Sequence, residues 1–163
     1  MATCQIWIEK RKAFMEYRRA TLHDMDKFLQ TRMEFVASIR NIPDAETFEK
    51  NTRKYLTDNM ESDKVIVLIA IEQGEIISSC MACLFELAPL TRCINGKYAE
   101  LMNVYTKKGF RKCGHAKKLL GMLIAELKCL GVEKLLLEYT PEGLPVYEKM
   151  GFEPLPNQMQ LFL

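Results

Sequence analysis

The sequence predicts a mixed α/β fold, in which a central twisted, mostly antiparallel sheet of six or seven strands is flanked by about four helices. The spacing of apolar residues changes repeatedly along the chain. Some segments have the apolar runs or two-residue alternation of strands, and others have the three-and-four spacing of helices. In addition, an amphipathic helix joins two apolar strands in the C-terminal half, as in a β-α-β crossover. The length of 163 residues is that of one domain, residues 1–163, with a core of its own.

The first third of the chain is expected to hold one strand and two helices. Residues 13–19 form a short strand. From Thr21, a candidate N-cap, the apolar residues follow helical spacing, and this helix ends before Pro43. Asp44 then caps a second amphipathic helix. The apolar residues on one face of that helix are Phe48, Tyr55 and Leu56.

Three strands are expected in the middle of the chain. Residues 65–71 are almost wholly aliphatic and β-branched, which predicts a strand buried on both faces. Gln73-Gly74-Glu75 is a turn, and residues 76–85 return as the second strand of a hairpin. A loop then leads into a further strand over residues 98–106.

The last part of the chain predicts two more helices and two more strands. Residues 116–127 have the clearest helical periodicity, and the helix stops at Gly131. Residues 133–140 form a central strand and residues 144–150 a short helix. Residues 158–163 are expected to be a last, apolar strand. The predicted order is therefore β-α-α-β-β-β-α-β-α-β.

The composition is that of an ordinary globular protein, with 48% hydrophobic and 27% charged residues. The net charge is only +2, which argues against a polybasic nucleic-acid binder. No stretch approaches the ~20 apolar residues of a membrane span. The N-terminus is too charged for a secretory signal, so a cytoplasmic protein is expected, with neither nucleic acid nor membrane as a partner.

The six cysteines do not form a metal-binding pattern. Only Cys80 and Cys83 have the C-x-x-C spacing, and no second pair of ligands has it. Because both fall in one predicted strand, their odd separation places the two sulfur atoms on opposite faces. We interpret them as buried structural thiols and expect no metal.

Residues 107–118, the basic loop, carry the strongest chemical signal. Six of these twelve residues are Lys or Arg and none is acidic. Gly109 and Gly114 let backbone N–H groups turn toward a ligand, and the following helix N-terminus adds positive charge. Lys117 and Lys118 oppose the helix dipole, a conflict that a bound multivalent anion would resolve. The alternative is a solvated basic turn.

The glycine spacing of this loop is that of the P-loop, but the rest of that motif is missing. His115 and Ala116 stand where Lys and Ser/Thr are needed. The run R-K-C-G-H-A, residues 111–116, instead resembles the Q/R-x-x-G-x-G/A loop of the GNAT superfamily of N-acetyltransferases, which cradles the pyrophosphate of acetyl-coenzyme A.

Two further segments resemble the same family. Residues 143–152, G-L-P-V-Y-E-K-M-G-F, are similar to its second signature, L-Y-E-K-x-G-F. Residues 18–25 look like its usual approach to the first helix. The sequence departs from the family at Thr140, where many members have a cofactor-contacting Asn, and at Gly143 and Pro145, which replace an Ala-containing turn.

The resemblance implies where acetyl-coenzyme A binds. Backbone groups of Val104 and Thr106 would pair with the pantetheine arm as an added strand does. The N–H of Val104 would also polarise the thioester carbonyl. The pyrophosphate would be held by backbone groups of Arg111, Lys112, Cys113, Gly114, His115, Ala116 and Lys117.

It also implies two catalytic residues. Tyr147 matches the family tyrosine near the departing sulfur, and its alternative role is that of a core tyrosine. Glu100 resembles the strand glutamate that serves as general base in one branch of the family, and its alternative role is a solvent-facing carboxylate. Glu34 and Glu138 are weaker candidates for contacting a cationic acceptor.

The expected function is acetyl transfer from acetyl-coenzyme A to a primary amine of a small molecule or protein, by direct attack in a ternary complex. The alternative is a non-catalytic acyl-coenzyme A-binding or sensing module. The apolar end of the chain, residues 159–163, is compatible with strand-mediated pairing across a homodimer.

Overall fold

The computed structural model describes residues 15–163, so the first two residues of the predicted first strand lie outside it. Five strands form one sheet with the order β1-β2-β3-β4-β5. Neighbouring strands are antiparallel except for β4 and β5, which are parallel. The strands are β1 (Met15–Arg19), β2 (Val65–Glu72), β3 (Glu75–Glu86), β4 (Lys97–Thr106) and β5 (Lys134–Leu137).

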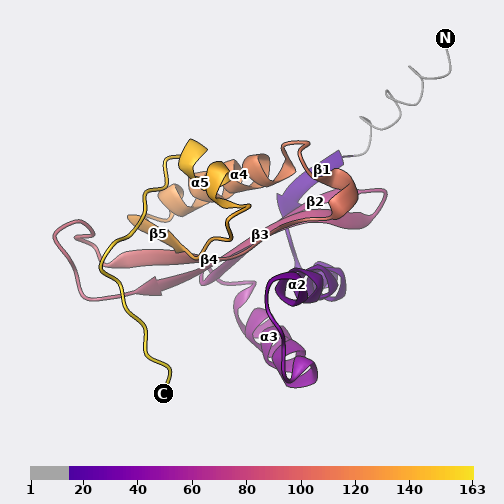
Figure 1. Ribbon diagram of the computed structural model, residues 1–163, viewed down its shortest axis with the longest axis horizontal. Helices are drawn as coiled ribbons and strands as arrows, with labels where there is room; N and C mark the ends of the chain where they lie inside the picture. The colour runs from indigo at the N-terminus through magenta and orange to yellow at the C-terminus, as the bar shows by residue number, and fades with distance from the viewer. Residues whose placement is uncertain (1–14) are drawn as a thin grey trace, which may run out of the picture.

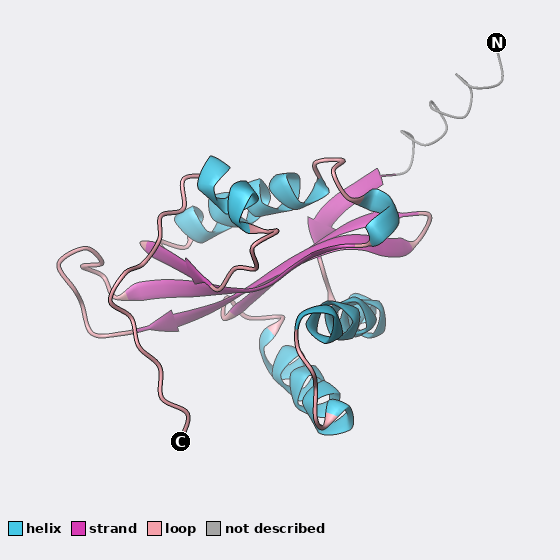
Figure 2. Cartoon of the chain, viewed as in Figure 1, coloured by secondary structure: helices cyan, strands magenta, loops and turns pink. Residues whose placement is uncertain are grey.

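Helices cover both faces of this sheet, as Figures 1 and 2 show. The α-helices of the described part are α2 (Met25–Ile39), α3 (Ala45–Asn59), α4 (His115–Cys129) and α5 (Leu144–Lys149). Short 3-10 turns, η1 (Leu22–Asp24) and η2 (Lys108–Phe110), precede α2 and α4. Helices α4 and α5 lie on one face and α2 and α3 on the other, which gives the sheet a separate apolar core on each side.

The interior strand β2 contributes to both cores, as its apolar run predicts. Ile66 and Leu68 pack under α4, whereas Val67 and Ile69 pack under α2 and α3. All four side chains are buried. The prediction of a strand buried on both faces is therefore confirmed, and its turn into β3 is the expected one.

Asp44 caps the second helix as predicted, whereas Thr21 caps the short turn η1 and Asp24 is the N-cap of α2. Thr21 and Asp24 form a capping box around η1, in which Asp24 Oδ2 accepts from Thr21 N at 2.9 Å. The regular α-helix begins after this turn, at Met25. Asp44 Oδ1 accepts from Thr47 N at 2.9 Å at the start of α3.

A β-bulge in β4 was not predicted. Met81 pairs with Asn103 and Ala82 with Leu101, so Met102 is an extra residue on β4. The bulge changes the faces on which the side chains lie. Leu101 and Val104, three residues apart, therefore both pack into the core under α4.

The predicted last strand, residues 158–163, is wrong. Figure 2 shows this segment as loop, and the side chains of Met159 and Leu161 are 99% and 82% exposed. Pro154 and Pro156 just before it cannot donate to a ladder. The sheet described therefore has five strands rather than six or seven.

The strand predicted over residues 133–140 is shorter than expected. Strand β5 ends at Leu137, because the chain then turns toward α5. Thr140 O accepts from Gly143 N at 2.9 Å and from Leu144 N at 3.1 Å, which holds this turn. The early end of β5 leaves part of β4 without a neighbour on that side among the residues described.

Cys80 and Cys83 lie on opposite faces of β3, as predicted. Cys80 belongs to the core under α4, and Cys83 packs against the core under α2 and α3. Burial raises the pKa of both thiols. Residues 15–163 contain no cluster of His, Cys, Asp or Glu suited to a metal ion. In the same range, every helix is too short or too polar to span a membrane.

Candidate active site

Residues 102–106 of β4 form an open edge. Strand β5 pairs with β4 only from Tyr98 to Leu101, so β4 continues for five residues without a partner on that side among the described residues. Figure 1 shows β5 as the short outer strand beside β4. The open edge leads directly into the basic loop and α4. An extended ligand chain can add to such an edge through main-chain hydrogen bonds.

The peptide groups of Val104 and Thr106 face this open edge. Lys107 donates its backbone N–H to Ile77 O in β3 at 2.9 Å. Because peptide groups alternate in direction along a strand, those of Val104 and Thr106 point away from β3. Thr106 O accepts from Arg111 Nε at 3.0 Å, which anchors the Arg111 side chain beside the edge.

The basic loop exposes a row of backbone N–H groups. Lys118 N bonds to Gly114 O at 3.0 Å and is the first amide of α4 with a helical acceptor. Among residues 15–163, no acceptor faces the amides of residues 112–117. Lys112 and Gly114 have φ angles of 62° and 84°, which turn the loop into the helix. A Cβ on Gly114 would meet nothing within 4 Å, so the space in front of it is open.

The side chains of the basic loop add positive charge that no neighbouring carboxylate of the described residues neutralises. No salt bridge joins any of its six cations to a carboxylate of the part of the chain described. Cys113 is exposed, and its thiol donates to Arg111 O at 3.5 Å. Unused amides, a helix N-terminus and these cations together favour a multivalent anion such as a pyrophosphate.

The His115 side chain is held by a residue that the sequence analysis missed. Tyr17, in β1, places its hydroxyl 2.6 Å from His115 Nδ1. His115 is 8% exposed, and Lys118 Nζ lies 3.6 Å from the centroid of the Tyr17 ring. No motif marks Tyr17, and the pairing joins residues that are 98 positions apart.

Tyr147 lies on the α4 side of the sheet. Its ring packs against the core there and contacts Phe152 edge-on, with 5.6 Å between the ring centroids. Burial raises its pKa, and the nearby Cys80 thiol raises it further. Cys80 is opposite Val104 in the β3–β4 register, so Tyr147 is in the neighbourhood of the open edge. The phenol keeps its proton at neutral pH and is able to donate it.

Glu100 lies on the other face of the sheet. It is opposite Cys83, which packs against the core under α2 and α3. The Glu100 side chain is half-buried. The structure therefore places Glu100 and Tyr147 on opposite sides of β4 and does not bring them into contact.

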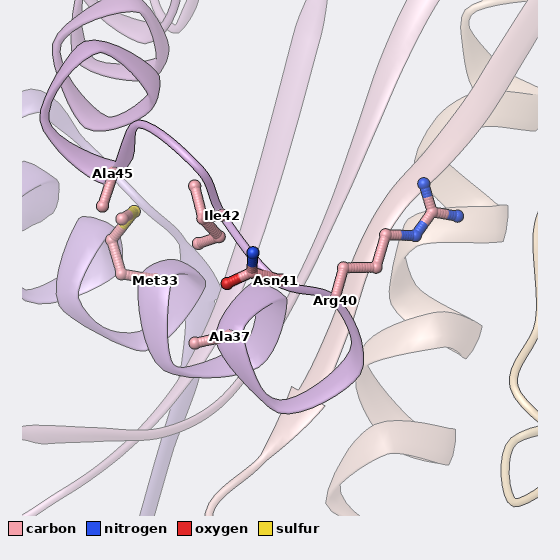
Figure 3. A pocket seen from close by; sticks show the side chains of 6 residues that line it. All are labelled: Met33, Ala37, Arg40, Asn41, Ile42 and Ala45. Atoms are coloured by element: carbon pink, nitrogen blue, oxygen red, sulfur yellow. The ribbon is translucent and has the colours of Figure 1, made fainter.

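Of the two weaker acidic candidates, Glu34 lies on α2 and Glu138 contacts Arg40, the residue that follows this helix. Glu34 Oε2 accepts from the Tyr105 hydroxyl at 3.3 Å, and the Tyr105 ring packs on Phe35. Glu138, just after β5, forms an exposed ion pair of 2.6 Å with Arg40. In Figure 3 the Arg40 side chain points away from a hollow of about 560 Å³ at the α2–α3 junction. That hollow is lined by Met33, Ala37, Arg40, Asn41, Ile42 and Ala45.

A second missed residue, Arg32, braces the bulge of β4. Its guanidinium donates to Met102 O at 3.3 Å and to Asn103 Oδ1 at 3.5 Å. Asn103 in turn donates to Ser79 Oγ at 3.1 Å. These buried groups fix the backbone one residue before Val104. Burial lowers the pKa of Arg32. An arginine and an asparagine inside otherwise apolar patterns are the only sequence signal for this contact.

The comparisons with known proteins identify the family of the chain. The profile of the acetyltransferase (GNAT) family matches residues 30–152, and the chain belongs to that family. It is therefore an acyltransferase of the N-acetyltransferase type. None of the curated proteins is a significant match to the sequence.

Several solved structures share the fold. A predicted acetyltransferase from Clostridium acetobutylicum, solved with acetyl-CoA, has a TM-score of 0.82 and 24% identity, covering 91% of this chain and 96% of that one. A GCN5-related N-acetyltransferase from Ralstonia eutropha JMP134 has a TM-score of 0.80 and 20% identity, covering 91% and 98%. Glucosamine-6-phosphate N-acetyltransferase from Arabidopsis thaliana has a TM-score of 0.67 and 19% identity, covering 91% and 97%.

Proposed function

We propose that this chain transfers an acetyl group from acetyl-coenzyme A to a primary amine of a small molecule or protein, by direct attack in a ternary complex. The observation that carries this proposal is the continuity of the open edge of β4 with the basic loop. The open edge of β4 binds the extended thioester chain, and the basic loop binds the pyrophosphate to which that chain is joined. The structure solved with acetyl-CoA from Clostridium acetobutylicum supports the same co-substrate.

In this proposal the chain's own backbone holds the co-substrate. Val104 and Thr106 pair with the pantetheine arm along the open edge. Amides of Lys112, Cys113, Gly114, His115, Ala116 and Lys117 receive the pyrophosphate, whereas the Arg111 N–H, also expected to do so, donates to Lys108 O at 3.5 Å. The Val104 N–H, fixed by the bulge behind it, donates to the thioester carbonyl and stabilises negative charge on its oxygen during attack.

The two catalytic candidates act from opposite faces of β4. A lysine-like amine is only about one part in 2,500 neutral at pH 7, so a base must take a proton from it. Glu100 takes this proton, directly or through water. The amine nitrogen attacks the carbonyl carbon and the C–S bond breaks. Tyr147, on the other face, donates its hydroxyl proton to the departing thiolate.

The acceptor enters from the side of α2 and α3. Glu34 gives this side negative charge, which favours a cationic amine, whereas the charge of Glu138 is compensated by its ion pair with Arg40. The name of the Arabidopsis enzyme describes an N-acetyltransferase of an amino sugar phosphate, which supports an amine as the acceptor on this fold. Pairing of the exposed tail, residues 159–163, in a homodimer is part of the proposal, as are a single domain over residues 1–163 and a cytoplasmic location.

A thiol-release assay tests the proposal. Release of coenzyme A from acetyl-coenzyme A is measured with a panel of small amines, polyamines, amino acids, aminoglycosides and lysine peptides. We expect amine-dependent release with at least one class. Binding of acetyl-coenzyme A without release across the panel would favour the acyl-coenzyme A-binding module instead. Absence of binding would contradict the proposed site.

A further inference from the structure

The strand β1 contributes a side chain to the start of α4. Tyr17 is opposite Ala70 in β2, and its ring packs into the core under α4. From there its hydroxyl reaches His115, the first residue of α4. Figure 1 shows β1 as a strand of the sheet and α4 over one face of that sheet. This contact joins the outer strand of the sheet, opposite the open edge of β4, to the basic loop.

The hydrogen bond fixes the orientation of the His115 ring. The phenol of Tyr17 has a pKa raised by burial and by the nearby Cys113 thiol, so it remains protonated. With neutral imidazole, the hydroxyl donates to Nδ1, and Nε2 carries the ring proton. His115 is nearly buried, so its ring cannot easily turn to another partner. The first residue of the helix is thereby held at a fixed position relative to β1.

The same tyrosine also holds a cation of the basic loop. Lys118 Nζ lies over the Tyr17 ring at 3.6 Å from its centroid. Lys118 N donates to Gly114 O, so Lys118 and Gly114 close the first turn of α4. One side chain therefore holds two residues of the turn from which the unused amides project.

We propose that Tyr17 is a positioning residue for the co-substrate, which acts through His115 and Lys118 to hold the basic loop in its pyrophosphate-binding form. This inference rests on the proposed function. Six consecutive backbone amides bind one anion well only if the loop is ordered beforehand, because ordering it during binding costs entropy. The loop has glycines at 109 and 114 and no carboxylate partner in the described chain. The Arg111–Thr106 hydrogen bond anchors its first half, and the contact with β1 orders the second half, from which the unused amides project.

Two ligands distinguish this role from a general structural one. Acetyl-coenzyme A contains the pyrophosphate, whereas acetyl-pantetheine lacks it and reaches only the open edge of β4. The dissociation constant of acetyl-coenzyme A is measured by calorimetry for the wild type and for Tyr17→Phe, Tyr17→Leu and the control Tyr55→Phe. Tyr55 lies on α3, on the far face of the sheet, and its variant also loses one phenol hydroxyl. Turnover with acetyl-pantetheine is measured in parallel.

For Tyr17→Phe we expect an increase of about five- to tenfold in the dissociation constant, the effect of one hydrogen bond. The turnover number at saturating acetyl-coenzyme A and the rate with acetyl-pantetheine should be unchanged. Tyr17→Leu, which also loses the ring beneath Lys118, should bind more weakly still. In a His115→Phe background, Tyr17→Phe should have no further effect, because the shared hydrogen bond is already absent.

Equal affinity of Tyr17→Phe and wild type would overturn the inference. An equal loss with acetyl-pantetheine would overturn it too, since the tyrosine would then support the whole fold. Failure of the wild type to bind acetyl-coenzyme A would instead contradict the proposed function, and with it this inference.

Discussion

At the scale of single residues, Tyr147 provides the sharpest test of the chemistry. Its raised pKa keeps the hydroxyl protonated at neutral pH, and Tyr147→Phe keeps the ring and its contact with Phe152. If the hydroxyl protonates the thiolate, the turnover number should fall ~10²-fold, while the affinity for acetyl-coenzyme A and the melting temperature change little. Steady-state kinetics and calorimetry measure these quantities. Normal turnover with a lowered melting temperature would make Tyr147 a core residue only.

Glu100 is the second residue to test, and the pH dependence of its variant is the informative measurement. Glu100→Gln should lower turnover ~10²–10⁴-fold at neutral pH if the carboxylate removes the proton of the amine. Much of that loss should disappear at high pH, where free amine is abundant. A pH–rate profile identical to that of the wild type would show that Glu100 is a strand carboxylate without a catalytic role. Glu34 and Glu138 would then be tested in the same way.

At the scale of elements, the junction of β1 and α2 makes stability depend on pH. Arg18 donates to both oxygens of Asp24, at 2.7 and 2.9 Å, and lowers the pKa of that carboxyl from 3.8 to about 2. A carboxyl whose pKa is lower in the folded state than in the unfolded state stabilises the fold at any pH above its unfolded-state pKa. This stabilisation is lost as the pH falls through its folded-state pKa. Asp24→Asn should therefore lower the free energy of unfolding by about 1 kcal/mol at neutral pH.

Urea unfolding between pH 7 and acidic pH measures this effect. The difference between wild type and Asp24→Asn should be constant down to about pH 4 and shrink from there toward pH 2, the window set by the two pKa values. Glu16→Gln is a suitable control, because Glu16 contacts the same arginine at 3.0 Å but is exposed. A difference that does not change with pH would mean that the charge of Asp24 contributes nothing.

The turn between β4 and α4 is tested with two glycines of similar conformation. Gly114 and Gly151 have φ angles of 84° and 88°, and a Cβ added at either position would meet no atom within 4 Å. Gly114→Asp and Gly151→Asp should therefore carry similar backbone strain. Only Gly114→Asp places a carboxylate in the pyrophosphate position, so only this variant should lose the rise in melting temperature caused by acetyl-coenzyme A. If folded Gly114→Asp binds normally, the assignment of the basic loop is wrong.

Most elements could be predicted because their signals are local. The caps at Thr21 and Asp44 and the apolar run of β2 depend on residues within one segment. The bulge at Met102 could not be predicted, because it arises from the register between β3 and β4. It determines which face Val104 occupies, so the alternation of the strand alone assigns this side chain to the wrong side.

In the candidate site, too, the features that depend on local sequence could be predicted and those that depend on long-range contacts could not. The basic loop and Tyr147 lie in motifs, so local sequence is enough to indicate both. The contact of Tyr17 with His115 and that of Arg32 with Met102 depend on elements folded against each other from distant parts of the chain. The end of β5 at Leu137, which exposes the edge of β4, likewise depends on the turn held by Thr140.

At the scale of the whole molecule, the C-terminal tail exposes a run of large apolar side chains. Met159, Leu161, Phe162 and Leu163 are each at least 82% exposed. Strand β5 has no partner on its outer edge among the described residues, so it can accept another strand. Strand-mediated pairing of two copies would bury these side chains and remove that edge.

The chain of 163 residues should therefore be a dimer, and the chain ending at Asn157 a monomer, as measured by light scattering after size-exclusion chromatography. Because the tail is exposed within one copy, its removal should leave the affinity for acetyl-coenzyme A unchanged. Met159→Gln combined with Leu161→Gln keeps the chain length and lowers only the apolar area, so it should weaken the dimer and make its mass depend on protein concentration. A monomeric wild type across the accessible concentration range would contradict strand pairing, whereas a dimer that survives truncation would place the interface elsewhere on the molecule.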